Sequence, residues 1–323
     1  MTTFDIRKNI ENLIDESRHD SLKNLNAIKH IGIDSEKDLV ILIIEIGRIG
    51  TEAESHLKRQ LAKVVKLDLG FKGIKISFQE VRNFQNSFNQ NTKFIIVSSG
   101  KGGVGKSFVS TNLAYALKRL GKNVGLIDAD IYGACVPKYL ETPYANIQVN
   151  HKNKIIPFRS FGIEFISMEF FADEGQPIVW RGSVLQNMIN NFFYQVEWSK
   201  DLDYVIIDAP TGTMDVILDL SKIVPNAECL IVTTPDKTSS YIATKAANAL
   251  KDMHHNIIGV VENLCNEEIY GKGGADVVAE KIGTEVLVQI PIKKPTYHDY
   301  LYEDSEENGK IFDDLANIIT IRD

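Results

Sequence analysis

The chain has 323 residues, of which 44% are hydrophobic, so it is long enough for two domains and for a large core. A formal charge of −7 argues against nucleic-acid binding, which depends on a clustered basic face. The first residues do not form a secretory signal, and no apolar run reaches the length of a membrane span. We therefore expect a cytoplasmic protein that binds neither nucleic acid nor a membrane.

Residues 1–82 are predicted to form a small α+β domain. Apolar residues follow helical spacing in two stretches, and two other stretches are typical of strands. The expected elements are a helix at Phe4–Ile14, a strand at Leu39–Ile46, a helix at Ala53–Leu67 and a strand at Ile74–Phe78. Residues 83–92 are rich in Asn and Gln and are predicted to be a linker.

Residues 93–323 alternate apolar strand-like runs with helical patterns. Repeated strand–helix–strand units with nearly continuous apolar strands predict an α/β domain with a mostly parallel, doubly wound sheet. The expected strands are Phe94–Ser98, Val124–Ile127, Phe165–Met168, Tyr204–Ile207, Cys229–Thr233, Ile257–Val261 and Val286–Ile290. Ligands of such sheets bind at the carboxyl ends of the strands.

A phosphate loop follows the first of these strands. The segment Gly100–Ser107 fits the pattern G-x-x-x-x-G-K-[ST] between a buried strand and a helix. Its glycines let backbone N–H groups turn toward phosphate oxygens, Lys106 carries charge to the β- and γ-phosphates, and Ser107 is a ligand for Mg²⁺. The residues expected to contact nucleotide here are Gly100, Lys101, Gly102, Gly103, Val104, Gly105, Lys106, Ser107 and Phe108.

Three carboxylates follow strand ends near this loop. We assign Asp130 to position the attacking water, Asp128 to the metal side beside it, and Asp208 to Mg²⁺ in the manner of a Walker B acid. The predicted metal ligands are thus Ser107, Asp128 and Asp208. Together with the two loop lysines, Lys101 and Lys106, Asp130 and Asp208 form the predicted catalytic set.

The nucleotide base is expected beside Asn263, which follows another strand in Val261–Glu262–Asn263. A side-chain amide at that place can hydrogen-bond a base edge. The sequence lacks a guanine-reading Asn-Lys-x-Asp motif, so adenine is favoured. We therefore predict a P-loop ATPase that uses ATP and Mg²⁺.

These motifs together resemble the Mrp/ApbC family of ATPases. With Lys101 directly after its first glycine, the segment Gly100–Ser107 resembles the deviant phosphate loop of the MinD/ParA class. In that class the extra lysine reaches the partner's nucleotide across a dimer interface. The resemblance implies a homodimeric ATPase that carries iron–sulfur clusters and transfers them to apo-proteins, with apo iron–sulfur proteins or cluster scaffold proteins as partners. Its further motifs are Asp128–Gly133, Val179–Gly182, Asp208–Pro210, Gly212–Thr213 and Asp215.

The chain departs from that family at the cluster-binding loop. Family members usually carry Cys-x-x-Cys after the Val-Glu-Asn strand, whereas here only Cys265 is present. Two protomers would supply two thiolates, and iron–sulfur clusters ordinarily have four. Two interpretations stay open for Cys265: a ligand of an incompletely protein-bound cluster, or an ordinary loop cysteine. The alternative function is a MinD/ParA-like ATP switch that regulates a protein partner without a cluster.

The same comparison predicts slow ATP hydrolysis. Phe108 stands where the family usually has Thr, and Thr211 and Met214 replace residues usual in the loop expected to sense the γ-phosphate.

Overall fold

The computed structural model describes residues 2–17, 19–25, 27–34, 37–47, 49–80, 87–130, 133–142, 146–171, 183–211, 214–266, 268 and 271–322. Its contacts divide the chain into two compact units, Met1–Asn83 and Phe84–Asp323. Within the described ranges, every helix is too short or too polar to cross a bilayer. The predicted domain limits at residues 82 and 93 remain predictions, although Phe88, inside the expected linker, is buried in the core of the second unit.

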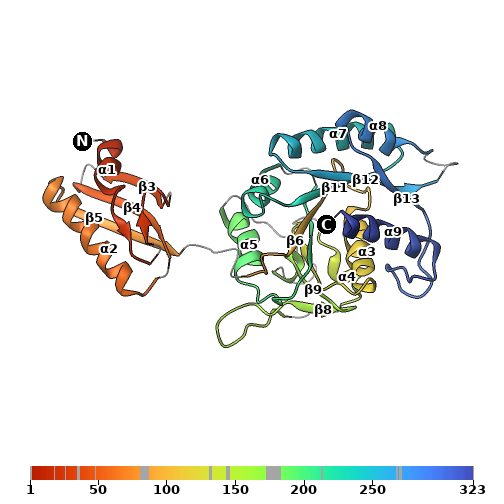
Figure 1. The fold of residues 1–323 in the computed structure, drawn as a ribbon, viewed down its shortest axis with the longest axis horizontal. Coiled ribbons are helices and arrows are strands. Elements are labelled where there is room, and N and C mark those ends of the chain that lie inside the picture. Colours follow the sequence, from red (N-terminus) through yellow and green to blue (C-terminus); the bar gives the residue numbers. More distant parts are fainter. Residues whose placement is uncertain are drawn as a thin grey trace. The chain divides into compact units, whose positions relative to one another are not determined.

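The first unit is a three-stranded sheet with helices on one face (Figure 1). The central strand β4 pairs antiparallel with β3 and parallel with β5, and α2 makes the parallel crossover. Its elements are α1 (Thr3–Ile10), β1 (Ile14–Asp15), β2 (Asp20–Ser21), β3 (Ile28–Asp34), β4 (Leu39–Ile46), α2 (Glu52–Lys63), a π-helical turn (Val64–Asp68) and β5 (Gly73–Glu80).

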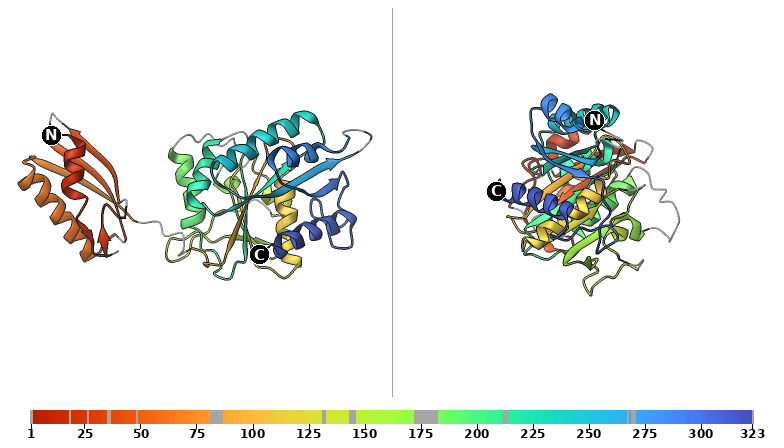
Figure 2. Two further views of the ribbon diagram at one scale, coloured as in Figure 1. Left: turned by 45° about the horizontal axis from the view of Figure 1, so that its top comes forward. Right: turned by 90° about the vertical axis from the view of Figure 1, so that its right-hand side faces the viewer.

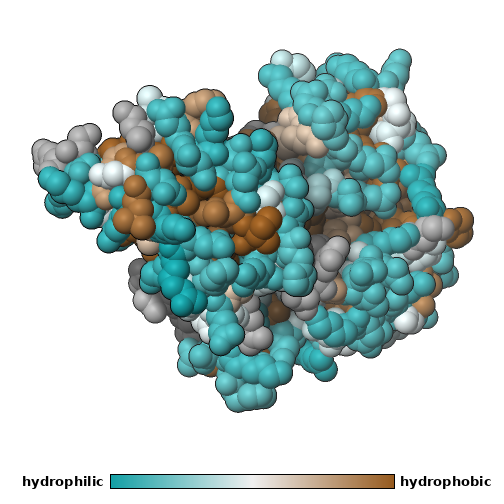
Figure 3. Space-filling view, turned by 60° about the vertical axis from the view of Figure 1, so that its left-hand side comes forward, coloured by the Kyte–Doolittle hydropathy of each residue, from teal (hydrophilic) through white to brown (hydrophobic). Residues whose placement is uncertain are grey.

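Alternation along β4 gives this sheet one fully buried face. Val40, Leu42, Ile44 and Ile46 are buried and pack with residues of α1 and α2 in one core. The intervening residues of β4, starting with Leu39, are only partly buried. Figure 3 shows hydrophobic residues gathered on the surface that this unit turns to the viewer.

The second unit is built on an eight-stranded sheet in the order β13-β12-β11-β6-β10-β7-β9-β8. All neighbouring strands are parallel except the edge pair β8 and β9. The strands are β6 (Lys93–Ser98), β7 (Val124–Asp128), β8 (Phe158–Ser160), β9 (Ile163–Ser167), β10 (Tyr204–Asp208), β11 (Glu228–Thr233), β12 (Ile257–Cys265) and β13 (Val286–Pro291). The predicted α/β sheet is confirmed.

Helices cover both faces of this sheet, as Figures 1 and 2 show. One layer contains α3 and α9, which pack on each other, and another contains α7 and α8. The helices are α3 (Lys106–Arg119), α4 (Val136–Tyr139), α5 (Ser183–Tyr194), α6 (Met214–Ile223), α7 (Lys237–Asp252), α8 (Gly274–Ile282) and α9 (Glu307–Ile321), with a 3₁₀ turn at Met168–Phe171. The sequence pattern did not predict the helices α4, α6 and α8 or the short strand β8.

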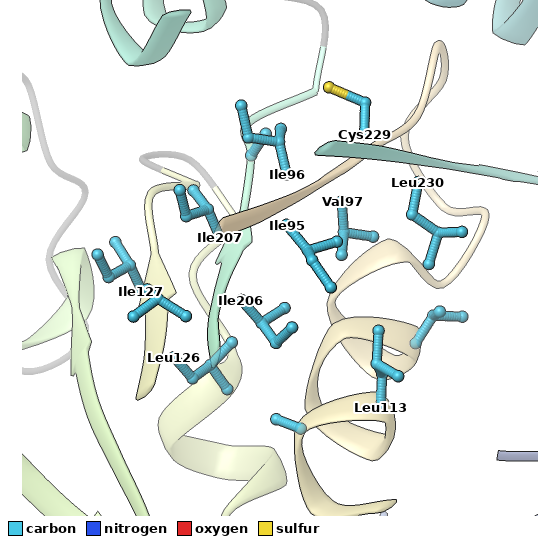
Figure 4. Close-up of a cluster of buried hydrophobic side chains, with 14 of the residues drawn as sticks. Ile95, Ile96, Val97, Leu113, Leu126, Ile127, Ile206, Ile207, Cys229 and Leu230 are labelled. Carbon is cyan, nitrogen blue, oxygen red and sulfur yellow. The ribbon is translucent and has the colours of Figure 1, made fainter. Parts of the chain in front are cut away.

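The core beneath the phosphate loop comes from the central strands. Register places Ile206 of β10 beside Ile95 and Leu126, and these side chains lie on the side of the sheet that carries Leu113 of α3 (Figure 4). The next residues in each strand point to the opposite face. Burial on both faces explains why the strands are continuous Ile, Leu and Val runs.

The helix α7 begins at a strong cap. Asp236 Oδ1 accepts hydrogen bonds from the N–H groups of Thr238 and Ser239, at 2.9 and 3.0 Å. The Ser239 hydroxyl also donates to this carboxylate and is the main cause of a pKa lowered to about 2. The folded protein therefore stabilises the ionised form of Asp236 relative to the unfolded chain.

We expect Asp236→Ala to lower the free energy of unfolding by about 1 kcal/mol at pH 7, because the cap is lost. The difference from wild type should persist above the unfolded pKa of about 3.9 and vanish as the pH falls through the folded pKa of about 2. Urea unfolding at several pH values measures it. Asp252→Ala, in the exposed last turn of the same helix, is the control and should cause no loss.

Candidate nucleotide-binding site

The phosphate loop connects β6 to α3 and depends on glycine conformations. Gly103 and Gly105 have φ values of 82° and 80°, a region that residues with a Cβ rarely adopt. A Cβ on Gly105 would lie 2.2 Å from Asn263 Nδ2, and one on Gly100 would lie 2.3 Å from the carbonyl of Ile242 in α7. The loop is thus held closely between β12 and α7, and its geometry fits a cradle for phosphate.

Lys106 is a buried cation between carboxylates. Its Nζ lies 2.6 Å from Asp208 Oδ1 and 3.7 Å from Asp130 Oδ2. Burial alone would lower the pKa of Lys106, but the neighbouring carboxylates outweigh burial and raise it. The side chain therefore stays charged at neutral pH, as a phosphate-binding lysine requires.

Asp208 collects contacts from the first turn of α3. Ser107 Oγ donates to Asp208 Oδ2 at 2.5 Å, and Ser110 Oγ lies 2.8 Å from Oδ1. The sequence analysis did not single out Ser110, although it lies one helical turn after Lys106. The carboxylate and hydroxyl oxygens of Asp208 and Ser107 are the hard ligands that Mg²⁺ prefers. The predicted metal pair is therefore chemically suited to the ion.

Asp128 is fully buried and holds the loop that follows β7. Its carboxylate accepts hydrogen bonds from the N–H groups of Asp130 and Val136, both at 3.2 Å, and from Ser167 Oγ at 2.9 Å. Burial, followed by the negative charge of Asp208, raises the pKa of Asp128 to about 8. These contacts indicate a structural task, and the predicted place of Asp128 in the metal site remains a prediction.

The loop residue Asp130 lies beside the phosphate-binding lysine. It is 7% exposed, and its Oδ1 accepts a hydrogen bond from Gly133 N at 3.1 Å. Asp130 is thus a nearly buried carboxylate within reach of the loop lysine, while Lys101 is exposed at the tip of the phosphate loop.

Asn263 supports the phosphate loop directly. Its Nδ2 donates to the carbonyl of Val104 at 2.9 Å, and the side chain is 1% exposed. The predicted contact with the base remains a prediction. Phe108 packs edge-on against Tyr139, Tyr302 and Phe312, which places its ring in an aromatic cluster beside α3.

The loop cysteine faces its own strand. Cys265 Sγ lies 3.4 Å from the carbonyl and 3.6 Å from Oε2 of Glu262. Burial and then the Glu262 carboxylate raise the pKa of the thiol to about 12. Since iron binds the thiolate, this geometry favours the thiol over the ligand form. Among the residues that the structure describes, no group of three or more His, Cys, Asp and Glu side chains could hold a metal.

Several motif residues lie outside the described ranges, so the structure does not place them. They are Ile131, Tyr132, Val179, Trp180, Arg181, Gly182, Gly212 and Thr213.

Known proteins resemble this chain over most of its length. A family model described as NUBPL iron-transfer P-loop NTPase matches residues 90–314. The chain belongs to this family. It is 35% identical to an iron–sulfur cluster carrier protein of Bacillus subtilis, over 98% of this chain and 96% of that protein. A Helicobacter pylori protein of the same name is 30% identical, over 91% and 83%.

Solved structures share the fold of this family member. A nucleotide-binding protein from Archaeoglobus fulgidus in complex with ADP matches with a TM-score of 0.54 and 26% identity, over 73% of this chain and 90% of that one. The cell division ATPase MinD from Pyrococcus furiosus has the same TM-score at 21% identity, over 72% and 99% of the two chains, and supports the fold alone. The deviant phosphate loop thus lies in a MinD-like P-loop fold.

We expect Asn263→Ala to weaken ATP and GTP binding equally, by about tenfold, because the buried carbonyl of Val104 loses its partner. Equilibrium titration with fluorescent analogues of both nucleotides measures this. A loss confined to ATP would contradict a bracing role alone and show that Asn263 reads the base. Asn256→Ala, which removes an exposed hydrogen bond to Glu228 before the same strand, is the control.

Proposed function

We propose that this chain is an ATP-dependent iron–sulfur cluster carrier that acts as a homodimer in the cytoplasm and transfers clusters to apo-proteins. The single observation that carries the proposal is the preassembled set of Lys106, Ser107 and Asp208 on the family's phosphate loop. The carrier names of relatives that match nearly the whole chain support the cargo.

Residues of the phosphate loop and the nearby carboxylates have different roles in ATP binding and hydrolysis. Backbone N–H groups of the glycine-rich loop and Lys106 bind the phosphates. Ser107 and Asp208 would hold Mg²⁺, which supplies positive charge to the phosphate oxygens. Asp130 orients the attacking water, since its Oδ2 lies 3.7 Å from Lys106 Nζ and its carboxylate stands outside the Ser107–Asp208 pair.

Dimerisation is assigned to Lys101. Its exposed position after Gly100 leaves the side chain available to a second protomer, while Lys106 is buried in its own site. ATP would then lie between two protomers and hold them together, so that its hydrolysis releases the pair. ATP hydrolysis would thus determine when the dimer separates and the cluster is transferred.

We propose that this chain and another protein each supply some of the ligands of the cluster. Two Cys265 thiolates from a dimer are half of an ordinary ligand set, so a scaffold protein or the client would supply the others. The contact between Cys265 and Glu262 is specific support for the second candidate, an ATP switch without a cluster, because it keeps the thiol protonated.

Lys106→Ala is expected to abolish ATP binding, because the phosphates lose their buried cation. Lys101→Ala should leave the dissociation constant of ATP within about twofold and prevent ATP-dependent dimerisation, because its charge acts on the other protomer. Calorimetric titration measures binding, and light scattering with and without ATP measures dimers. Equal loss of ATP affinity in both variants would contradict the assignment across subunits.

Anaerobic reconstitution tests the cargo. We expect wild type to bind iron and sulfide in stoichiometric amounts per dimer and Cys265→Ala to lose them, with visible absorbance as a second readout. Cys229→Ala is the control, because Cys229 is fully buried in β11 and should not ligate a cluster. If wild type binds ATP but no cluster, the carrier function is wrong and the switch function replaces it.

A further inference from the structure

Three polar side chains stand in a row at the carboxyl edge of the sheet. Strand register pairs Asp208 at the end of β10 with Asp128 at the end of β7, and Asp128 with Ser167 at the end of β9. The first two belong to the predicted nucleotide site. Ser167 is the third member of the row, and the proposed function gives it no task.

The Ser167 hydroxyl joins two parts of the chain. It is fully buried, donates to Asp128 Oδ2 at 2.9 Å and accepts from the N–H group of Glu169 at 3.1 Å. Glu169 belongs to the 3₁₀ turn that follows β9. The hydroxyl therefore uses its donor and an acceptor lone pair at once, which fixes its direction.

Asp128 passes this restraint to both ends of a loop. Its Oδ1 accepts from the N–H group of Asp130, and its Oδ2 accepts from that of Val136 at the start of α4. Asp130 and Val136, which lie on either side of this loop, therefore both donate to one buried carboxyl group. Ser167 is the side chain that ties this carboxylate to the neighbouring strand.

We propose that Ser167 is a positioning residue for ATP hydrolysis, which fixes Asp130 through Asp128 without contacting nucleotide. This proposal rests on the proposed ATPase function of Asp130. Lys106 and Ser107 bind the phosphates without contact to Ser167. The placement of the water depends on Ser167, because Ser167 holds Asp128 and Asp128 holds the loop of Asp130. The restraint therefore acts on turnover and leaves nucleotide affinity unchanged.

The test compares Ser167→Ala and Ser167→Thr with wild type in the full-length protein. Ser167→Ala should lower kcat roughly tenfold, the effect of one lost buried hydrogen bond, with KM and ADP affinity unchanged. Ser167→Thr keeps the hydroxyl in a strand-compatible residue and should restore most of kcat. A merely structural role would not produce this split and rescue.

The matched control is Thr92→Val. Thr92 is a buried residue just before β6, and its hydroxyl donates to the carbonyl of Leu202 at 2.8 Å, away from the nucleotide edge. This variant also loses a hydrogen bond donated by a buried hydroxyl and should keep wild-type kcat. A similar fall in kcat for Ser167→Ala and Thr92→Val would mean that a general loss of stability, and not positioning, is the cause.

Residue-resolved hydrogen exchange tests the anchor without turnover. In Ser167→Ala the amides of Asp130 and Val136 should exchange faster, while those of Gly103 and Gly105 keep their wild-type rates. Unchanged kcat with unchanged exchange, or failure of Ser167→Thr to rescue, overturns the proposal. If wild type hydrolyses no ATP, the ATPase function fails, and the exchange rates alone then show whether Ser167 anchors the loop.

Discussion

The buried pairing of Lys106 with Asp208 is the interaction on which the rest of the second unit depends. Removing a charge from water is costly unless an opposite charge and hydrogen bonds replace the solvent. Here Asp208 receives Lys106, Ser107 and Ser110 at once, all from the start of α3. The strand that ends in Asp208 and the helix that begins with Lys106 must therefore meet in one arrangement.

The parallel sheet supplies that arrangement. β6 and β10 are neighbours, so the phosphate loop and Asp208 leave the sheet at the same edge. Moving outward, the register brings in Asp128 and then Ser167, which hold the loop of Asp130. Asn263 secures the loop from β12. The phosphate loop is thus supported from β12, and the loop of Asp130 is supported from β7 and β9.

Cys265 differs from the phosphate-loop residues in its contacts. Lys106, Ser107 and Asp208 contact one another, whereas Cys265 contacts Glu262 of its own strand. Glu262 also caps the start of α8 through Gly273 and Ala275, so it is held in place independently of the thiol. Glu262 is therefore positioned beside the thiol without depending on it, and its charge opposes formation of the Cys265 thiolate.

The sequence by itself predicted seven strands of the larger sheet in their order along the chain and the phosphate loop, and it singled out Lys106, Ser107, Asp130 and Asp208 as candidates, because short-range patterns encode these features. It did not predict the bonds of Ser110 and Ser167 or the support of Val104 by Asn263. Those join residues far apart in the chain, and a lone serine at a strand end has no distinctive pattern. Only the tertiary structure decided them, because register and helix packing determine which strand ends become neighbours.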